Sequence, residues 1–86
     1  MYYVYLLQSL DGEKHYIGFT NNVERRLSEH NRGENTSTRH WQWKVIYYEA
    51  YEDERLARSR EVKLKKNSRM RQILMQRFSE NDRVVG

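Results

Sequence analysis

The chain opens on a dense run of hydrophobic residues that predicts a β-strand. Residues 2–9 are rich in Tyr, Val and Leu, which are residue types that strands favour. Asp11-Gly12 supplies turn chemistry, and a second strand is predicted at about residues 15–19. Because the connection between the two strands is short, we expect them to pair as an antiparallel hairpin. A third strand is predicted at about residues 44–51.

A helix is predicted directly after the hairpin. Asn21 stands three residues before Glu24, the spacing of a capping box in which each side chain satisfies a free backbone N–H. Residues at helical spacing follow in Val23, Leu27 and His30. Gly33 is a natural helix end. The polar segment 34–43 that comes next predicts an exposed loop.

Two more helices are predicted in the second half of the chain. The acidic residues 52–54 suit a helix N-terminus, and the helix is predicted to run to about Lys66. Residues 67–68 break and recap the chain. A last amphipathic helix has a 3.6-residue period marked by Met70, Ile73, Leu74 and Phe78. Because periodicity then ends, we expect one domain at residues 1–79 and a loose tail at 80–86.

These elements predict a small α/β fold in the order β-β-α-β-α-α, with a three-stranded antiparallel sheet flanked by helices. The length of 86 residues allows one domain with a small core. Hydrophobic residues make up 37% of the chain, and bulky aromatic side chains supply core material. Charged residues make up 33%, which places much charge on the surface.

Several classes of protein are excluded by composition. The chain has no cysteine, which excludes disulfides, thiolate chemistry and cysteine-based zinc sites. No stretch approaches the roughly 20 apolar residues that a membrane span needs. The first residues lack a basic leader and a small-residue cleavage site, so they are typical of a strand and not of a signal peptide. We therefore expect a soluble cytoplasmic protein without a membrane partner.

Positive charge is concentrated in the second half of the chain. The net charge is +4, and nine basic side chains lie between Arg55 and Arg77, where Glu61 is the one acid. A clustered positive field attracts polyanions, with nucleic acid first among them. The alternative is a basic helix surface that is simply solvated and has no partner. A run of charge without other evidence favours this alternative.

Glu61 is the first polar residue that does not suit its position. It lies between Ala57 and Leu64 on the hydrophobic stripe of the second helix, so we expect it to face the sheet. A partly buried carboxylate is costly unless it is paired or holds a cation. It could form an internal salt bridge, to Arg26 or another base, or it could bind a divalent metal ion.

Arg26 and His30 are the second such feature. Arg26 lies beside the stripe formed by Val23 and Leu27, whereas Arg25 points roughly the opposite way. Arg26 and His30 are four residues apart, so their side chains are neighbours on one flank of the helix. They could clamp and protonate a phosphate. Alternatively, a lone arginine reaches solvent beside a half-buried histidine.

Tyrosines on the paired strands are the third feature of this kind, because each carries a hydroxyl at a position predicted to be buried. Tyr3, Tyr5 and Leu7 share one face of the first strand, and Tyr16 lies just before Gly18 on the second. A glycine in a strand lets another group approach the backbone closely. Aromatic stripes on strands usually belong to the core. However, two buried hydroxyls need partners and could bracket a water molecule or a phosphate oxygen.

Taken together, these segments resemble the GIY-YIG nucleases. The two motif tripeptides are Tyr3-Val4-Tyr5 and Tyr16-Ile17-Gly18, and they are followed by the arginine-bearing segment 21–30 and the basic segment 60–66. The family includes the N-terminal domain of the excinuclease subunit UvrC and catalytic domains of homing endonucleases. The nearest resemblance is to its small stand-alone bacterial (URI) group. Tyr3 and Val4 depart from the glycine and isoleucine of the family name.

The resemblance implies a metal-dependent endonuclease that hydrolyses phosphodiester bonds, in DNA more than in RNA, in repair or recombination. Its catalytic residues would be Tyr5, Tyr16, Arg26, His30 and Glu61, with Gly18 as a structural motif residue. Glu61 would hold one Mg²⁺ or Mn²⁺ ion. We expect nucleic acid to contact basic side chains on two helices, which are Arg25, Arg58, Lys63, Lys65, Lys66 and Arg69.

Two other functions remain open. The chain could be a nucleic-acid-binding module that keeps the scaffold with little or no catalysis. It could also be a subunit, monomeric or weakly dimeric, whose target is selected by a protein partner.

Overall fold

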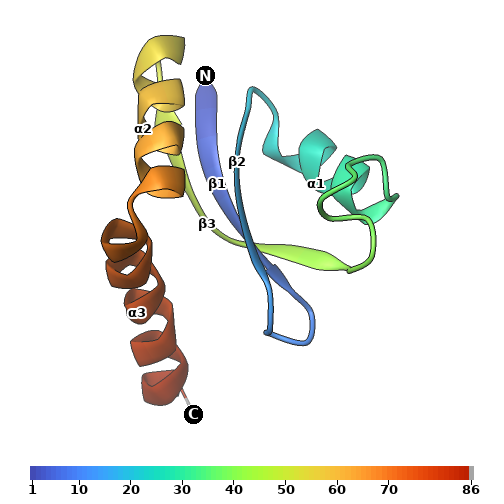
Figure 1. The fold of residues 1–86 in the computed structure, drawn as a ribbon, viewed down its shortest axis with the longest axis vertical. Helices are drawn as coiled ribbons and strands as arrows, with labels where there is room; N and C mark the ends of the chain where they lie inside the picture. Colours follow the sequence, from blue (N-terminus) through green and yellow to red (C-terminus); the bar gives the residue numbers. More distant parts are fainter. Residues whose placement is uncertain (86) are drawn as a thin grey trace.

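A three-stranded sheet lies between one helix on one face and two helices on the other (Figure 1). The computed structural model describes the backbone of residues 1–85 and the side chains of residues 1–78. The elements, in chain order, are β1 (Tyr2–Ser9), β2 (His15–Thr20), α1 (Val23–Asn31), β3 (Trp43–Tyr51), α2 (Glu54–Lys66) and α3 (Ser68–Val85). The predicted fold class and element order are confirmed.

Strand β1 is the centre of the sheet, in the order β2-β1-β3, and it pairs antiparallel with both neighbours. Both of its faces are covered, so Val4 through Leu7 are all buried. Val4 and Leu6 pack with α2 and α3 around Ala57, Leu64 and Leu74. The opposite face, with Tyr5 and Leu7, packs against Trp43 and against Leu27 of α1.

Helix α1 begins one residue later than its sequence predicts. The side chain of Asn22, not of Asn21, accepts the backbone N–H of Arg25 at 3.0 Å, so the predicted capping box of Asn21 and Glu24 is wrong. Asn21 instead accepts a hydrogen bond from the Arg25 guanidinium. Asparagine suits the N-cap position at either residue, but only Asn21 has a glutamate three residues later, and the extended backbone of Asn22 decides in favour of Asn22.

The C-terminus of α1 is closed as expected at Gly33. Its φ of +79° is a conformation that side chains disfavour, and its N–H donates to the carbonyl of His30. The N–H of Glu34 donates to the carbonyl of Glu29, which completes a Schellman motif. Because this motif fixes the last turn, it also fixes the backbone that carries His30.

Asn67 joins α2 to α3, as the break predicted at residues 67–68 requires. Its N–H donates to the carbonyl of Lys63 at the end of α2, and its side chain accepts the N–H of Met70 at the start of α3. The backbone of α3 continues to Val85, so residues 80–85 are helical where the sequence predicts no regular structure. Gly86 lies outside the described residues, and the domain boundary after residue 79 stays a prediction.

None of the helices in the described part of the chain is both long and apolar enough to cross a membrane.

Replacing Asn22 by alanine should lower the free energy of unfolding by about 1 kcal/mol, because the first turn of α1 loses its cap. Asn21→Ala, which removes an exposed side chain-to-side chain hydrogen bond, should cost less. Urea unfolding followed by circular dichroism measures both. Equal losses, or a larger loss for Asn21→Ala, would contradict the position of the cap.

Candidate functional site

A buried chain of hydrogen bonds links the central strand, helix α1 and the loop that follows it. The hydroxyl of Tyr5 lies 2.8 Å from Nε2 of His30, and Nδ1 of His30 lies 2.7 Å from the hydroxyl of Thr38. The three side chains are 0–2% exposed. The indole N–H of Trp43 donates to the carbonyl of Thr38 at 2.9 Å, which holds the loop against the sheet.

Gly18 makes room for this arrangement. It pairs with Tyr5 across the β1–β2 ladder, and the tyrosine ring lies over it. A Cβ at position 18 would collide with the hydroxyl oxygen and two ring carbons of Tyr5. The group that approaches the backbone of β2 is therefore the tyrosine of the first motif.

Tyr16 and Glu61 border the same region. The ring of Tyr16 lies 4.9 Å from the His30 ring and 6.4 Å from the Tyr5 ring, measured between centroids. Lys65 connects Tyr16 to Glu61, because its Nζ lies 5.6 Å from the Tyr16 ring centroid and 3.0 Å from Oε2 of Glu61. An open hollow of about 300 Å³ adjoins Tyr16 and Lys65.

Glu61 faces inward, as its place on the hydrophobic stripe predicts. Its side chain is 17% exposed, and Ala57 and Leu64 on either side are fully buried. Of the two alternatives, the structure contains a salt bridge, and its partner is the half-exposed Lys65 and not Arg26. A lysine one turn further along the same helix leaves the carboxylate facing the sheet.

Arg26 lies close to the Tyr5 hydroxyl, in agreement with its predicted direction. Its side chain is 28% exposed and pairs with Glu29 at 2.9 Å, whereas Arg25 is more exposed. The charge of Arg26 acts on the pKa of Tyr5. Tyr5, Tyr16 and His30 thus form one cluster with Arg26 beside it, and Glu61 is linked to this cluster through Lys65.

Burial sets the protonation of the Tyr5–His30 pair. It raises the pKa of Tyr5 to about 12, although hydrogen bonding by Arg26 works against it. Burial, helped by the charge of Arg26, lowers the pKa of His30 to about 4. At neutral pH the tyrosine is therefore protonated and the histidine is neutral.

Hydrogen-bond directions follow from the partners of Thr38. Its hydroxyl lies 3.4 Å from the carbonyl of Asn35, which can only accept. We therefore assign Nδ1–H of His30 as the donor to Thr38, which leaves Nε2 to accept the hydroxyl proton of Tyr5. Every buried polar side-chain atom of Tyr5, His30 and Thr38 then has a hydrogen-bond partner.

The donor set near Glu61 fits a metal ion held by a single carboxylate. Within residues 1–78 there is no group of three His, Cys, Asp or Glu side chains that could enclose a metal ion. Mg²⁺ is commonly bound by one or two carboxylates, with water molecules and substrate phosphates completing its octahedral shell. Glu61, a partly buried single carboxylate, suits that mode and not a closed protein cage.

The six predicted nucleic-acid contacts have different surroundings. Lys65 lies beside Tyr16, and Arg58 lies over the ring of Phe19 at 4.3 Å while pairing with Glu54. Three others, Lys63, Lys66 and Arg69, line a separate hollow of about 560 Å³ where α2 meets α3. Arg25 lies on α1, apart from these.

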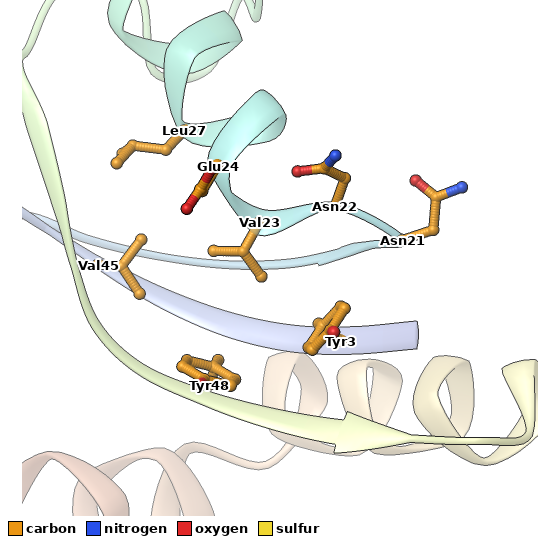
Figure 2. A pocket seen from close by; sticks show the side chains of 8 residues that line it. All are labelled: Tyr3, Asn21, Asn22, Val23, Glu24, Leu27, Val45 and Tyr48. Atoms are coloured by element: carbon orange, nitrogen blue, oxygen red, sulfur yellow. The ribbon is translucent and has the colours of Figure 1, made fainter. Parts of the chain in front are cut away.

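A groove of about 650 Å³ lies between α1 and the sheet. Figure 2 shows Val23 and Leu27 of α1 facing Val45 and Tyr48 of β3, with Tyr3 of β1 between the strands. No lysine or arginine lines this groove. Its lining shares none of the five catalytic candidates, so it is separate from the site around Tyr5.

Two residues of the site are absent from the sequence-based prediction. Thr38 lies in a polar loop with no periodicity, so no sequence signal marks it as buried. Glu29 follows Arg26 by three residues, and that helical spacing could have identified it as the partner of the guanidinium.

Comparison with known proteins matches residues 1–73 to the GIY-YIG catalytic domain. A UPF0213 protein of Clostridium perfringens is 39% identical over 75 residues, covering 85% of this chain and 80% of that protein. UPF0213 proteins of Haloquadratum walsbyi and Natronomonas pharaonis are 36% and 37% identical over 70 residues each, covering 79% of this chain and 78% and 81% of theirs. No solved structure gives a significant match.

Gly18→Ala should lower the free energy of unfolding by about 1–3 kcal/mol, because the new methyl group overpacks the space that Tyr5 occupies. Combining it with Tyr5→Ala should remove most of this cost, since the colliding ring is then absent. Urea unfolding of the single and double variants measures the coupling. Additive losses would contradict the contact.

Lowering the pH from 7 to 5 should destabilise the fold by about 1–2 kcal/mol through His30 alone. Its pKa is about 4 when folded and near 6.5 when unfolded, so the unfolded chain binds more protons between those values. The stabilisation is therefore complete above pH 6.5 and is lost as the pH falls toward 4. His30→Gln should reduce the pH dependence of urea unfolding, whereas His40→Gln, at an exposed position, should not. Equal pH dependence in the wild type and His30→Gln would refute this.

Proposed function

We propose that this chain, which belongs to the GIY-YIG catalytic-domain family and is related to the UPF0213 proteins, is a metal-dependent endonuclease. It would hydrolyse phosphodiester bonds in nucleic acid. The observation that carries the proposal is the cluster of Tyr5, Tyr16 and His30, with Arg26 beside Tyr5 and with Glu61 linked to Tyr16 through Lys65. An aromatic core alone does not require an arginine and a glutamate at its border.

Arg26 is the residue that would meet the phosphate. Its guanidinium can offset the negative charge that grows on the phosphate oxygens as water attacks phosphorus and the bond to the leaving oxygen breaks. Glu29 holds the guanidinium from one side at 2.9 Å. A pre-oriented charge does not have to reorganise during the reaction.

Tyr5 and Tyr16 would orient the attacking water, and His30 would fix the direction of the Tyr5 hydroxyl. With pKa values of about 12 and about 4, neither Tyr5 nor His30 changes protonation near pH 7. Because the Tyr5 proton is directed at Nε2 of His30, a lone pair of its hydroxyl oxygen stays available to accept a hydrogen bond. Tyr16, half-buried beside the open hollow, offers a second hydroxyl.

Glu61 would hold one Mg²⁺ or Mn²⁺ ion. When bound, such an ion polarises the scissile phosphate and stabilises the leaving oxygen. For Glu61 to serve as ligand, its carboxylate has to exchange the ammonium group of Lys65 for the ion. Lys65 would then be free to approach the nucleic acid near Tyr16.

We propose DNA as the substrate, in repair or recombination in the cytoplasm, because the nucleases that the motifs resemble act in those processes. The contacts expected at Arg25, Arg58, Lys63, Lys65, Lys66 and Arg69 are with phosphates, which position a protein without distinguishing base sequence. A protein partner that selects the target is therefore part of the proposal.

A second function, nucleic-acid binding without cleavage, is favoured by the Glu61–Lys65 pair. A carboxylate neutralised at 3.0 Å by an ammonium group needs no metal ion to compensate its burial. Such a module would shift DNA in a gel in a salt-dependent manner without cutting it, whichever divalent metal is present.

Glu61→Gln and Arg26→Ala should each reduce metal-dependent nicking of DNA by at least about 100-fold, since each removes a charge that acts on the transition state. The folds should persist, because both side chains lie partly open to solvent. Nicking of supercoiled DNA, with Mg²⁺ and with Mn²⁺, provides the measurement.

Arg32→Ala is the matched control, because it removes an arginine one residue beyond α1 that is exposed and pairs with Glu34. It should cleave as the wild type does. Undiminished cleavage by a purified Arg26→Ala/Glu61→Gln double variant would rule out the proposed site. A wild type that binds DNA but never cleaves it would favour the binding module instead.

A further inference from the structure

A second polar cluster lies on the α2 face of the sheet, around Glu49 of β3. Arg60 donates to both of its oxygens, from Nε at 2.9 Å and from Nη2 at 3.0 Å. The hydroxyls of Tyr47 and Tyr51, two residues to either side on the same strand, donate to it at 2.6 and 2.7 Å. One carboxylate therefore receives four hydrogen bonds, and none of these residues takes part in the site around Tyr5.

The cluster is far more constrained than the surface ion pairs of the chain. Glu49 is 16% exposed and Arg60 is 29% exposed. A bidentate contact fixes the plane and direction of a guanidinium, which a single contact to a lysine does not. Because the hydroxyls of Tyr47 and Tyr51 fix the Glu49 carboxylate from the strand side, the Arg60 guanidinium is held in one position.

Arg60 is the residue immediately before Glu61. Successive residues of a helix lie about 100° apart, so these two side chains stand on opposite flanks of the buried stripe of Ala57 and Leu64. Arg60 reaches β3 on one flank, and Glu61 lies beside Lys65 and the region of Tyr16 on the other. The contact at Glu49 therefore constrains the rotation of α2 about its own axis.

We propose that Arg60 and Glu49 are positioning residues that fix the rotation of α2 and thereby direct Glu61 toward Tyr5 and Tyr16. The inference concerns the geometry of α2, and its catalytic meaning rests on the proposed function of Glu61. Leu64 anchors the buried stripe in the core, but Ala57, which has no side chain beyond Cβ, resists rolling little at the other end of that stripe. The bidentate pair adds a second, polar point of attachment between the two.

The sensitivity of the site to such a roll is high. A carboxylate about 6 Å from the helix axis moves by about 1 Å when the helix rolls by about 10°, and a misplacement of about 1 Å can cost about 100-fold in rate. Removing the pair should therefore alter Glu61 without touching it.

Glu49→Gln tests this directly, because it keeps the shape of the side chain and removes the charge that holds Arg60. Mn²⁺ binding to the full chain, followed by electron paramagnetic resonance, should weaken by about 10-fold or more, as is typical when groups behind a metal ligand are changed. The turnover number for nicking should fall while the Michaelis constant for DNA stays within about 2-fold. Arg60→Lys, which keeps the charge but loses the bidentate contact, should give an intermediate effect.

Glu52→Gln removes an exposed carboxylate between β3 and α2 and is the control for lost charge. In a Glu61→Gln background, Glu49→Gln should cause no further loss of Mn²⁺ affinity, since both act through one ligand. All variants are compared well below their unfolding temperatures. Equal Mn²⁺ affinity and unchanged turnover in Glu49→Gln, in a wild type that binds and cleaves, would overturn the positioning role.

A readout that does not depend on activity separates the two proposals. Nuclear Overhauser contacts between the Lys65 side chain and the Tyr16 ring, expected from their 5.6 Å separation, report the rotation of α2. They should weaken in Glu49→Gln and persist in Glu52→Gln. If the wild type neither binds Mn²⁺ nor cleaves, the proposed function fails, and unchanged contacts in Glu49→Gln would independently refute the positioning of α2.

Discussion

The need of one buried phenol for a hydrogen-bond partner organises this structure. Tyr5 lies on the central strand under α1, and an unsatisfied hydroxyl there would cost about 1–3 kcal/mol. His30 satisfies it, and Thr38 satisfies the other nitrogen of His30. That one requirement ties the last turn of α1 and the following loop to the central strand, and the tyrosine itself leaves no space for a side chain at position 18. Arg26, one turn before His30, is placed by the same helix.

Much of the fold follows from local sequence patterns, whereas the site follows from them only in part. The order of elements, the inward direction of Glu61 and the difference between Arg25 and Arg26 all depend on strand alternation or helical rotation, which the sequence records. The helix cap does not, because the capping-box spacing favours Asn21, whereas the backbone geometry selects Asn22. The role of Thr38 cannot be predicted from the sequence, because its partner His30 lies eight residues away across an irregular loop.

Charged residues show the same limit. The sequence indicates that Glu61 needs a partner. It does not identify Lys65, because α2 carries several basic side chains that could serve. Likewise, nothing in the spacing of Glu49 and Arg60, eleven residues apart in different elements, predicts a bidentate contact. Such pairs depend on how α2 crosses the sheet. They are tertiary features, and they determine whether the side chains that motifs identify are also correctly directed.

The overlap of Tyr5 with the space above Gly18 has a consequence for how such sequences can diverge. A larger residue at position 18 destabilises the fold as long as the tyrosine is present, and loss of the tyrosine leaves a void that a larger residue at position 18 could fill. Substitutions at the two positions should therefore be inherited together, with the tyrosine lost first. A relative that keeps the glycine but lacks the tyrosine would mark an intermediate on that path.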